Sequence, residues 1–284
     1  MSLFITSLNS GSNGNCYYVG NAQEAVLVDV GISCRETEKR LQRLGLDIKK
    51  VKAIFISHEH SDHIKGVEVL SRKHRLPVYI TLPTLRSGGL RLESELVTEF
   101  KPHQEITVGG LCIKAFPKFH DASDPHSFII SENGITIGVF TDIGSLCGNV
   151  IENFKRCHAA FLETNYDETM LEEGNYPFYL KKRIRGTHGH LSNHQALELF
   201  VNHRASFLSH ILLSHLSKEN NSPQLAQKLF EQHAGTTKVV VASRYYETPV
   251  FKITENAVEE EAGVMVRPNM TQQAARVNIQ TSLF

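Results

Sequence analysis

Four side chains of metal-binding type lie within six residues of one another, in His58-x-His60-x-Asp62-His63. They come directly after the apolar run Val51–Ser57, which is predicted to be a strand. Imidazole and carboxylate are ligands that suit zinc, manganese and iron. On a tight loop, residues two apart can point the same way, so His58 and His60 can share one metal. Asp62 and His63, beyond the turn, can reach a second, and the motif therefore predicts a site for two metals.

This motif resembles the HxHxDH signature of the metallo-β-lactamase superfamily. The resemblance continues as an ordered series of motifs over roughly residues 3–253. Asp29 closes an early predicted strand, as an acidic residue does in the superfamily. Asp142 and His215 each follow a later predicted strand, at the places of the superfamily's bridging aspartate and last histidine.

The resemblance implies two divalent cations, with zinc expected first and manganese or iron as alternatives. The implied ligands are His58, His60 and His120 for one metal, and Asp62, His63 and His215 for the other. Asp142 would bridge both metals, and Asp29 would orient a ligand from behind. His126 lies close to His120 in the sequence and is an alternative third-motif histidine.

Such a metal pair would activate water for hydrolysis. Two cations about 3.5–4 Å apart hold a water between them and lower its pKa towards neutrality. They also stabilise negative charge on the attacked centre and the leaving oxygen, which benefits an anionic phosphodiester in particular. Asp62 is a candidate to accept a proton from the water. We see no competing Ser-His-Asp set in the sequence.

Three segments outside the metal motifs resemble the YycJ/WalJ-like branch of the superfamily. They are Asn9–Cys16, Leu162–Asp167 and Gly189–Asn193, the last followed later by Ser214–Asn221. This resemblance implies a metal-dependent 5′-to-3′ exonuclease that acts on DNA.

The same branch resemblance points to residues that would contact the substrate. His190 is expected to hydrogen-bond the scissile phosphate or to protonate the leaving oxygen; its ordinary alternative is a capping or structural histidine. Ser12 and Asn15 lie in a glycine-serine loop whose backbone amides are expected to face a phosphate, unless it is only a turn. His188 is given no role.

A basic run adds a possible contact to the nucleic-acid backbone. Lys181, Lys182 and Arg183 are expected to bind phosphates, which would make binding salt-dependent. The alternative is a solvated helix face.

Two other functions compete with a nuclease. The first is hydrolysis of a small thioester or lactone on the same metal pair. A β-lactamase is disfavoured, because most β-lactamases lack a bridging aspartate comparable with Asp142. The second is a binding or scaffold protein without catalysis, which an intact ligand set disfavours.

The expected fold is α/β, a four-layer αββα metallo-β-lactamase sandwich with the metal site at one edge. Residues 1–254 are expected to form the hydrolase domain and residues 255–284 a C-terminal extension. Turn signals such as Asn133-Gly134 predict hairpins, and Ser33, Ser192 and Ser222 predict helix starts. A helix is expected from Ile64 to about His74 and another over Leu82–Leu92.

Composition limits the remaining possibilities. The 284 residues carry a formal net charge of zero, so no whole-molecule field captures nucleic acid, although a local basic patch can. No run of about 18 apolar residues predicts a membrane span. The five cysteines show no CxxC pair, and Met1–Ile5 shows no secretory signal. We expect a cytoplasmic protein with reduced thiols; the sequence carries no signal for an oligomeric state.

Overall fold

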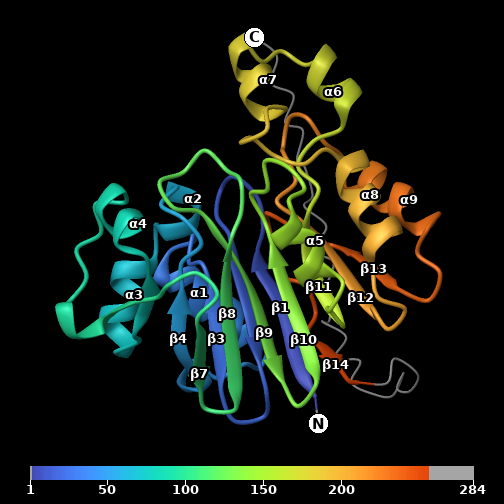
Figure 1. The fold of residues 1–284 in the computed structure, drawn as a ribbon. Helices are drawn as coiled ribbons and strands as arrows, with labels where there is room; N and C mark the ends of the chain where they lie inside the picture. Colours follow the sequence, from blue (N-terminus) through green and yellow to red (C-terminus); the bar gives the residue numbers. More distant parts are fainter. Residues whose placement is uncertain (1, 256–284) are drawn as a thin grey trace, which may run out of the picture.

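Two seven-stranded sheets make up the centre of the computed structural model, which describes residues 2–255 (Figure 1). The first sheet has the order β14-β1-β2-β3-β4-β5-β6 and the second β13-β12-β11-β10-β9-β8-β7. The strands of the first are β1 Leu3–Asn9, β2 Cys16–Gly20, β3 Ala25–Val28, β4 Val51–Phe55, β5 Val78–Ile80, β6 Val97–Glu99 and β14 Phe251–Ile253. Those of the second are β7 Glu105–Val108, β8 Leu111–Pro117, β9 His126–Glu132, β10 Ile135–Phe140, β11 Ala159–Glu163, β12 His210–Ser214 and β13 Lys238–Val241.

The helices pack on the outer faces of the two sheets. Figure 1 shows α1, α3 and α4 beside the first sheet, and α5, α8 and α9 beside the second, while α6 and α7 stand together at one end. Their bounds are α1 Cys34–Arg43, α2 Ser61–Ile64, α3 Val67–His74, α4 Leu82–Ser87, α5 Gly148–Phe154, α6 Glu168–Glu173, α7 Phe178–Ile184, α8 Asn193–His203 and α9 Pro223–Glu231. Two single-turn 3₁₀ helices cover Ile48–Lys50 and Ser94–Leu96.

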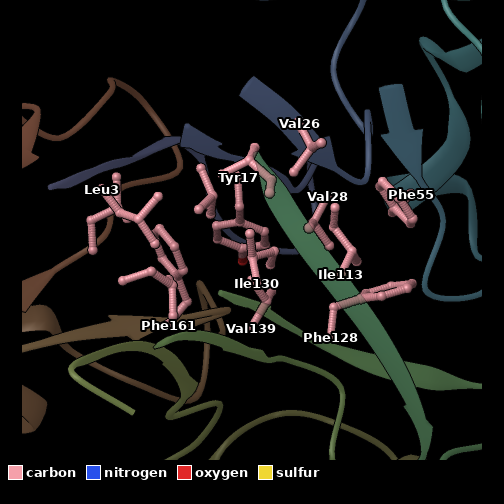
Figure 2. Close-up of a cluster of buried hydrophobic side chains, with 14 of the residues drawn as sticks. Leu3, Tyr17, Val26, Val28, Phe55, Ile113, Phe128, Ile130, Val139 and Phe161 are labelled. Carbon is pink, nitrogen blue, oxygen red and sulfur yellow. The ribbon is translucent and has the colours of Figure 1, made fainter. Parts of the chain in front are cut away.

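Three hydrophobic clusters join these four layers. The central one lies between the sheets, where Tyr17 and Phe55 of the first sheet meet Phe128 and Phe161 of the second (Figure 2). The other two join each sheet to its own helices. Alternate residues of a strand point to opposite faces, so the same strands serve two clusters at once. The expected αββα sandwich is therefore confirmed.

Both sheets change strand direction at a defined place. β3 pairs antiparallel with β2 and parallel with β4, and β10 pairs antiparallel with β9 and parallel with β11. The parallel strands beyond each of these places end at the same edge of their sheet. In α/β proteins, sites form beyond the carboxyl ends of such strands. The predicted ligands follow β4, β10 and β12 there.

Local structure departs from the sequence prediction in two helices. The helix expected from Ile64 is broken into α2 and α3 at Gly66, where a Cβ would lie 2.0 Å from the carbonyl oxygen of Ile32. The helix expected over Leu82–Leu92 ends at Ser87, because Gly88 and Gly89 follow it. The Asn133-Gly134 turn is confirmed, with φ of 49° and 84°.

No helix of the described region, residues 2–255, is long and apolar enough to span a bilayer. All five cysteines are free thiols. The predicted extension lies outside the described residues from residue 256 onward.

Candidate metal centre

The structure brings His58, His60 and His120 together, as the sequence predicted. β4 ends at Phe55, and the chain turns at His60, which precedes the first residue of α2. His60 Nδ1 lies 3.0 Å from His58 Nε2 and 3.3 Å from His120 Nε2. His120 comes from the loop after β8, and its own Nδ1 donates to the carbonyl of Gly189 at 2.9 Å. Three imidazole nitrogens thus converge on one point.

A second group forms beside the first from Asp62, His63 and His215. Asp62 Oδ2 lies 3.3 Å from His215 Nε2 and 3.5 Å from His63 Nε2. Asp62 and His63 are placed by the first turn of α2, whereas His215 directly follows β12. The candidate ligand atoms of each trio lie within 4.8 Å of one another.

Asp142 lies between the two groups. Its Oδ2 is 3.1 Å from His63 Nε2, and its Oδ1 is 3.8 Å from His120 Nε2 and 3.4 Å from His215 Nδ1. The residue is almost fully buried, and the contact of Oδ2 with His63 is not aligned as a hydrogen bond. A buried carboxylate oxygen without a well-aligned hydrogen bond is costly in a protein, and a cation beside it removes that cost.

Three of these positions have left-handed backbone. Asp29 follows β3 with φ 60°, Asp142 follows β10 with φ 53°, and His215 follows β12 with φ 57°. Non-glycine residues adopt this conformation rarely, and it turns the chain sharply. Each turn lets a side chain at the end of a buried strand face the centre.

Protonation states suit metal ligands. Burial holds the pKa of His58 well below its usual range and lowers that of His120 to about 3, so both rings are neutral. Burial alone would raise the pKa of Asp142, but His215 and His63 hold it well below the usual range. Asp142 is therefore ionised.

The surrounding carboxylates raise the pKa values of the other two imidazoles, those of His63 and His215. Although burial opposes it, Asp142, Asp29 and Asp62 raise the pKa of His63, and Asp142 with Asp62 raises that of His215 to about 10. The centre thus attracts positive charge strongly. Histidine and carboxylate donors in this number fit divalent cations, which take the place of those protons.

Asp29 supports the first half of the centre from behind, as predicted. It is fully buried and accepts hydrogen bonds from the backbone and hydroxyl of Ser57, both at 2.8 Å. Its Oδ2 also accepts from His63 Nδ1 at 2.7 Å, which leaves His63 Nε2 facing the centre. This arrangement fixes the tautomer of the ring.

Glu163 performs the same task in the second half, and the sequence analysis gave it no role. It ends β11 and is fully buried. Its Oε1 accepts from His190 Nδ1 at 2.7 Å and from His215 Nδ1 at 3.1 Å. Burial would raise its pKa, but His190 and these hydrogen bonds lower it to about 2. Its place directly after an apolar run was the available signal.

A cleft of about 360 Å³ opens above the two groups. The predicted residues Ser12, Arg183 and His190 line it, together with Asn165 and Ser217. Arg183 forms an ion pair with Asp121 at its rim. Lys181 and Lys182 do not line this cleft, and the ammonium of Lys181 donates to the carbonyl of Glu172.

Asn15 and its loop correct one prediction. Asn15 is buried, and its amide donates to Asp62 Oδ2 at 3.1 Å, so it braces a candidate ligand and is not exposed to a substrate. The backbone amides of Gly11, Gly14 and Asn15 already donate within the protein. Of this loop, Ser12 is exposed and lines the cleft, whereas Gly11, Gly14 and Asn15 are buried.

His126 and His188, which the sequence analysis also considered, lie outside the centre. His126 Nδ1 lies 2.9 Å from the carbonyl of Asp124, and the ring packs against Phe100. His188 is exposed beside Phe119. The structure therefore places His120, and not His126, among the candidate metal ligands.

Comparison with known proteins agrees with this geometry. The β-lactamase superfamily domain matches residues 24–215. The chain belongs to the metallo-β-lactamase superfamily. A member in Bacillus anthracis, named exodeoxyribonuclease YycJ, is 34% identical over 237 residues, which are 82% of this chain and 89% of that protein. Exodeoxyribonuclease WalJ of Streptococcus pneumoniae is 32% identical over 224 residues, 77% of this chain and 83% of that one.

Solved structures of the superfamily share the fold. The metallo-β-lactamase fold protein YhfI of Bacillus subtilis superposes with a TM-score of 0.69 over 89% of this chain and all of that one, at 16% identity. The superfamily fold implies divalent metal ions, and the two trios provide sites for them.

Proposed function

We propose that this protein is a two-metal phosphodiesterase, and specifically a 5′-to-3′ DNA exonuclease. The observation that carries the proposal is the convergence of seven side chains from both sheets below a cleft that His190 lines. The names of the YycJ and WalJ relatives, which match most of this chain, supply the substrate class.

Each candidate ligand then has a role. We assign one metal to His58, His60 and His120, the other to Asp62, His63 and His215, and the bridging position to Asp142. When bound, two divalent metals supply an activated water and stabilise charge on the phosphate. Zinc is our first expectation, with manganese or iron as alternatives. Asp62 is also placed to take a proton from the attacking water.

His190 is the candidate acid. Because Nδ1 donates to Glu163, the other ring nitrogen, Nε2, is left for the substrate. With both ring nitrogens protonated, Nε2 would donate to the scissile phosphate or give its proton to the leaving oxygen. Glu163 is a positioning residue that holds the ring through its Nδ1–H. Ser12 and Arg183 would contact the phosphate at the cleft wall.

End-labelled duplex DNA and a generic thioester test this function against its alternatives. Metal-loaded protein is expected to shorten the DNA progressively from the 5′ end and to leave the thioester intact. Thioester turnover with intact DNA would contradict the proposal, and turnover of neither substrate, with metal bound, would favour a scaffold.

A matched pair of variants tests the role of His190. His190→Ala is expected to lower kcat on DNA by about 100-fold or more, the usual contribution of an acid-base group. His188→Ala removes a neighbouring exposed imidazole outside the cleft and is expected to keep full activity. Equal activities of the two variants would remove His190 from the reaction.

A further inference from the structure

A second groove lies beside the metal cleft. Its volume is about 590 Å³, and it runs along the end of β13 and the start of α9. Ser217 lines both the groove and the metal cleft, so the two hollows adjoin. Lys218 and Arg244 line the groove, and none of the residues that line it is acidic.

Two adjacent aromatic side chains lie on this groove with most of their surface in solvent. Tyr245 is 67% exposed and Tyr246 66% exposed. Exposed large aromatic residues that gather in one place mark binding surfaces more often than isolated ones do.

The backbone that carries the tyrosines is held firmly. Arg40 donates to the carbonyl of Tyr245 at 3.1 Å, and Asn13 donates to the carbonyl of Arg244 at 2.9 Å. The amide of Ser10 donates to Ser243 at 3.0 Å, which ties the segment to the loop that lines the cleft. Exposed rings on an anchored backbone lose little entropy when they bind a ligand.

We propose that this groove holds the single strand of DNA that leads to the metal cleft, with bases stacked on Tyr245 and Tyr246. Single strands bind to aromatic rings for stacking and to basic side chains for the phosphates, and this groove offers both. Lys218 and Arg244 supply the positive charge, and the guanidinium of Arg244 also donates to the carbonyl of Leu216 in the groove wall, which leaves its charge in place. The proposal rests on the proposed exonuclease function and adds the path of its substrate.

The helix α7 carries the competing aromatic pair, Phe178 and Tyr179, which are 70% and 74% exposed. Two of the cations at its C-terminal end are paired with carboxylates, because Arg185 pairs with Glu172 and Arg183 pairs with Asp121, whereas no acidic residue lines the groove. The guanidinium of Arg185 also covers the face of Phe178. Lys218 has only the exposed Glu219 at 3.4 Å, and an exposed pair of this kind is weak. The groove is therefore the better path.

The test compares two double variants of the full, metal-loaded chain. For each, kcat/KM is measured on a 5′-labelled single-stranded oligonucleotide and on a small chromogenic phosphodiester, which is too short to reach the groove. Tyr245→Ala with Tyr246→Ala is expected to lower the ratio of kcat/KM on the oligonucleotide to kcat/KM on the small diester by at least about tenfold. The reason is that each stacked base contributes substantially to the binding free energy. Tyr245→Phe with Tyr246→Phe keeps both rings and is expected to restore the ratio.

Phe178→Ala with Tyr179→Ala is the control and is expected to leave the ratio unchanged. An unchanged ratio in the tyrosine-to-alanine pair, with DNA still degraded by the wild type, would overturn the strand path alone. A fall in the α7 control pair instead would move the path to that helix and overturn the proposal. Failure of the wild type to degrade DNA would overturn the proposed function itself, which separates the two failures.

Discussion

The two sheets contribute to the metal centre in different ways. The first sheet delivers four candidate ligands in one loop after β4, so that six consecutive residues carry most of its chemistry. The second delivers its groups one at a time, after β8, β10 and β12, and they lie far apart in the sequence. The relative positions of ligands in one loop are determined by a single turn. The relative positions of ligands that follow different strands depend on how all those strands pair within the sheet.

Each half also has its own buried carboxylate, and the two differ in what they hold. Asp29 fixes the single imidazole of His63. Glu163 contacts two imidazoles, those of His215 and His190, and also accepts from the backbone amide of Ile143 at 2.6 Å. The first carboxylate therefore serves metal binding alone, whereas the second links a candidate metal ligand to the candidate acid.

Removal of the group shared by both halves should have the largest effect. Asp142→Asn is expected to lower DNA hydrolysis by more than about 100-fold, because loss of an indirect partner alone costs 10–100-fold. Metal content per chain, measured by mass spectrometry of the elements, should fall at both sites. Asp124→Asn, outside the centre, is the control. Full activity of Asp142→Asn would show that this aspartate does not bridge.

Kinetic measurements should distinguish the roles of the two supporting carboxylates, Asp29 and Glu163. Asp29→Asn and Glu163→Gln are each expected to lower activity by about 10–100-fold. Added metal should restore kcat in Asp29→Asn, because that variant only binds metal more weakly. It should not restore kcat in Glu163→Gln, because His190 loses the charged carboxylate that accepts from its Nδ1–H. If added metal restored kcat equally in both variants, Asp29 and Glu163 would serve metal binding alike, and the proposed difference between the two carboxylates would be wrong.

Backbone crowding offers a smaller perturbation of the first half. A Cβ at Gly31 would lie 1.6 Å from the carbonyl oxygen of Asp62, so Gly31→Ala must displace the ligand loop. We expect a loss of about 1–3 kcal/mol in unfolding free energy, the usual cost of overpacking. Gly148→Ala meets no atom within 4 Å and is the control. Denaturant unfolding measures both, and similar stabilities would refute the close approach.

The smallest effect is expected at the cleft rim. Arg183→Ala should weaken DNA binding a few-fold and reduce the slope of log affinity against log salt by about 1, the signature of one phosphate contact. Lys181→Ala should leave the slope unchanged, since Lys181 does not line the cleft. Titrations at several salt concentrations distinguish them. A lower slope in Lys181→Ala would show that the DNA backbone also contacts α7 outside the cleft.

The comparison of halves also explains what the sequence could reveal. The positions of four candidate ligands could be predicted, because all four lie in one short loop and their spacing in the sequence determines which side chains point the same way. They are His58, His60, Asp62 and His63. Asp142 and His215 were accessible through their places after apolar strands, in the order that the superfamily resemblance supplied. The αββα layers followed from strand and helix periodicity in the same way.

Other features depend on contacts that spacing does not encode. The hydrogen bonds of Glu163 could not be predicted from the sequence, because they depend on the parallel pairing that places the end of β11 beside β12 and His190. Asn15 was misassigned because a polar glycine-rich loop usually faces solvent, whereas here it is buried against Asp62. The break at Gly66 depends on the distant carbonyl of Ile32.

The central claim is a metal pair held jointly by the two sheets. Anomalous diffraction at the metal edge, on crystals of protein loaded with zinc or manganese, tests it most directly. The account predicts two peaks on either side of Asp142, one within reach of His58, His60 and His120 and the other within reach of Asp62, His63 and His215. A single peak, or a peak pair that does not contact Asp142, would contradict it.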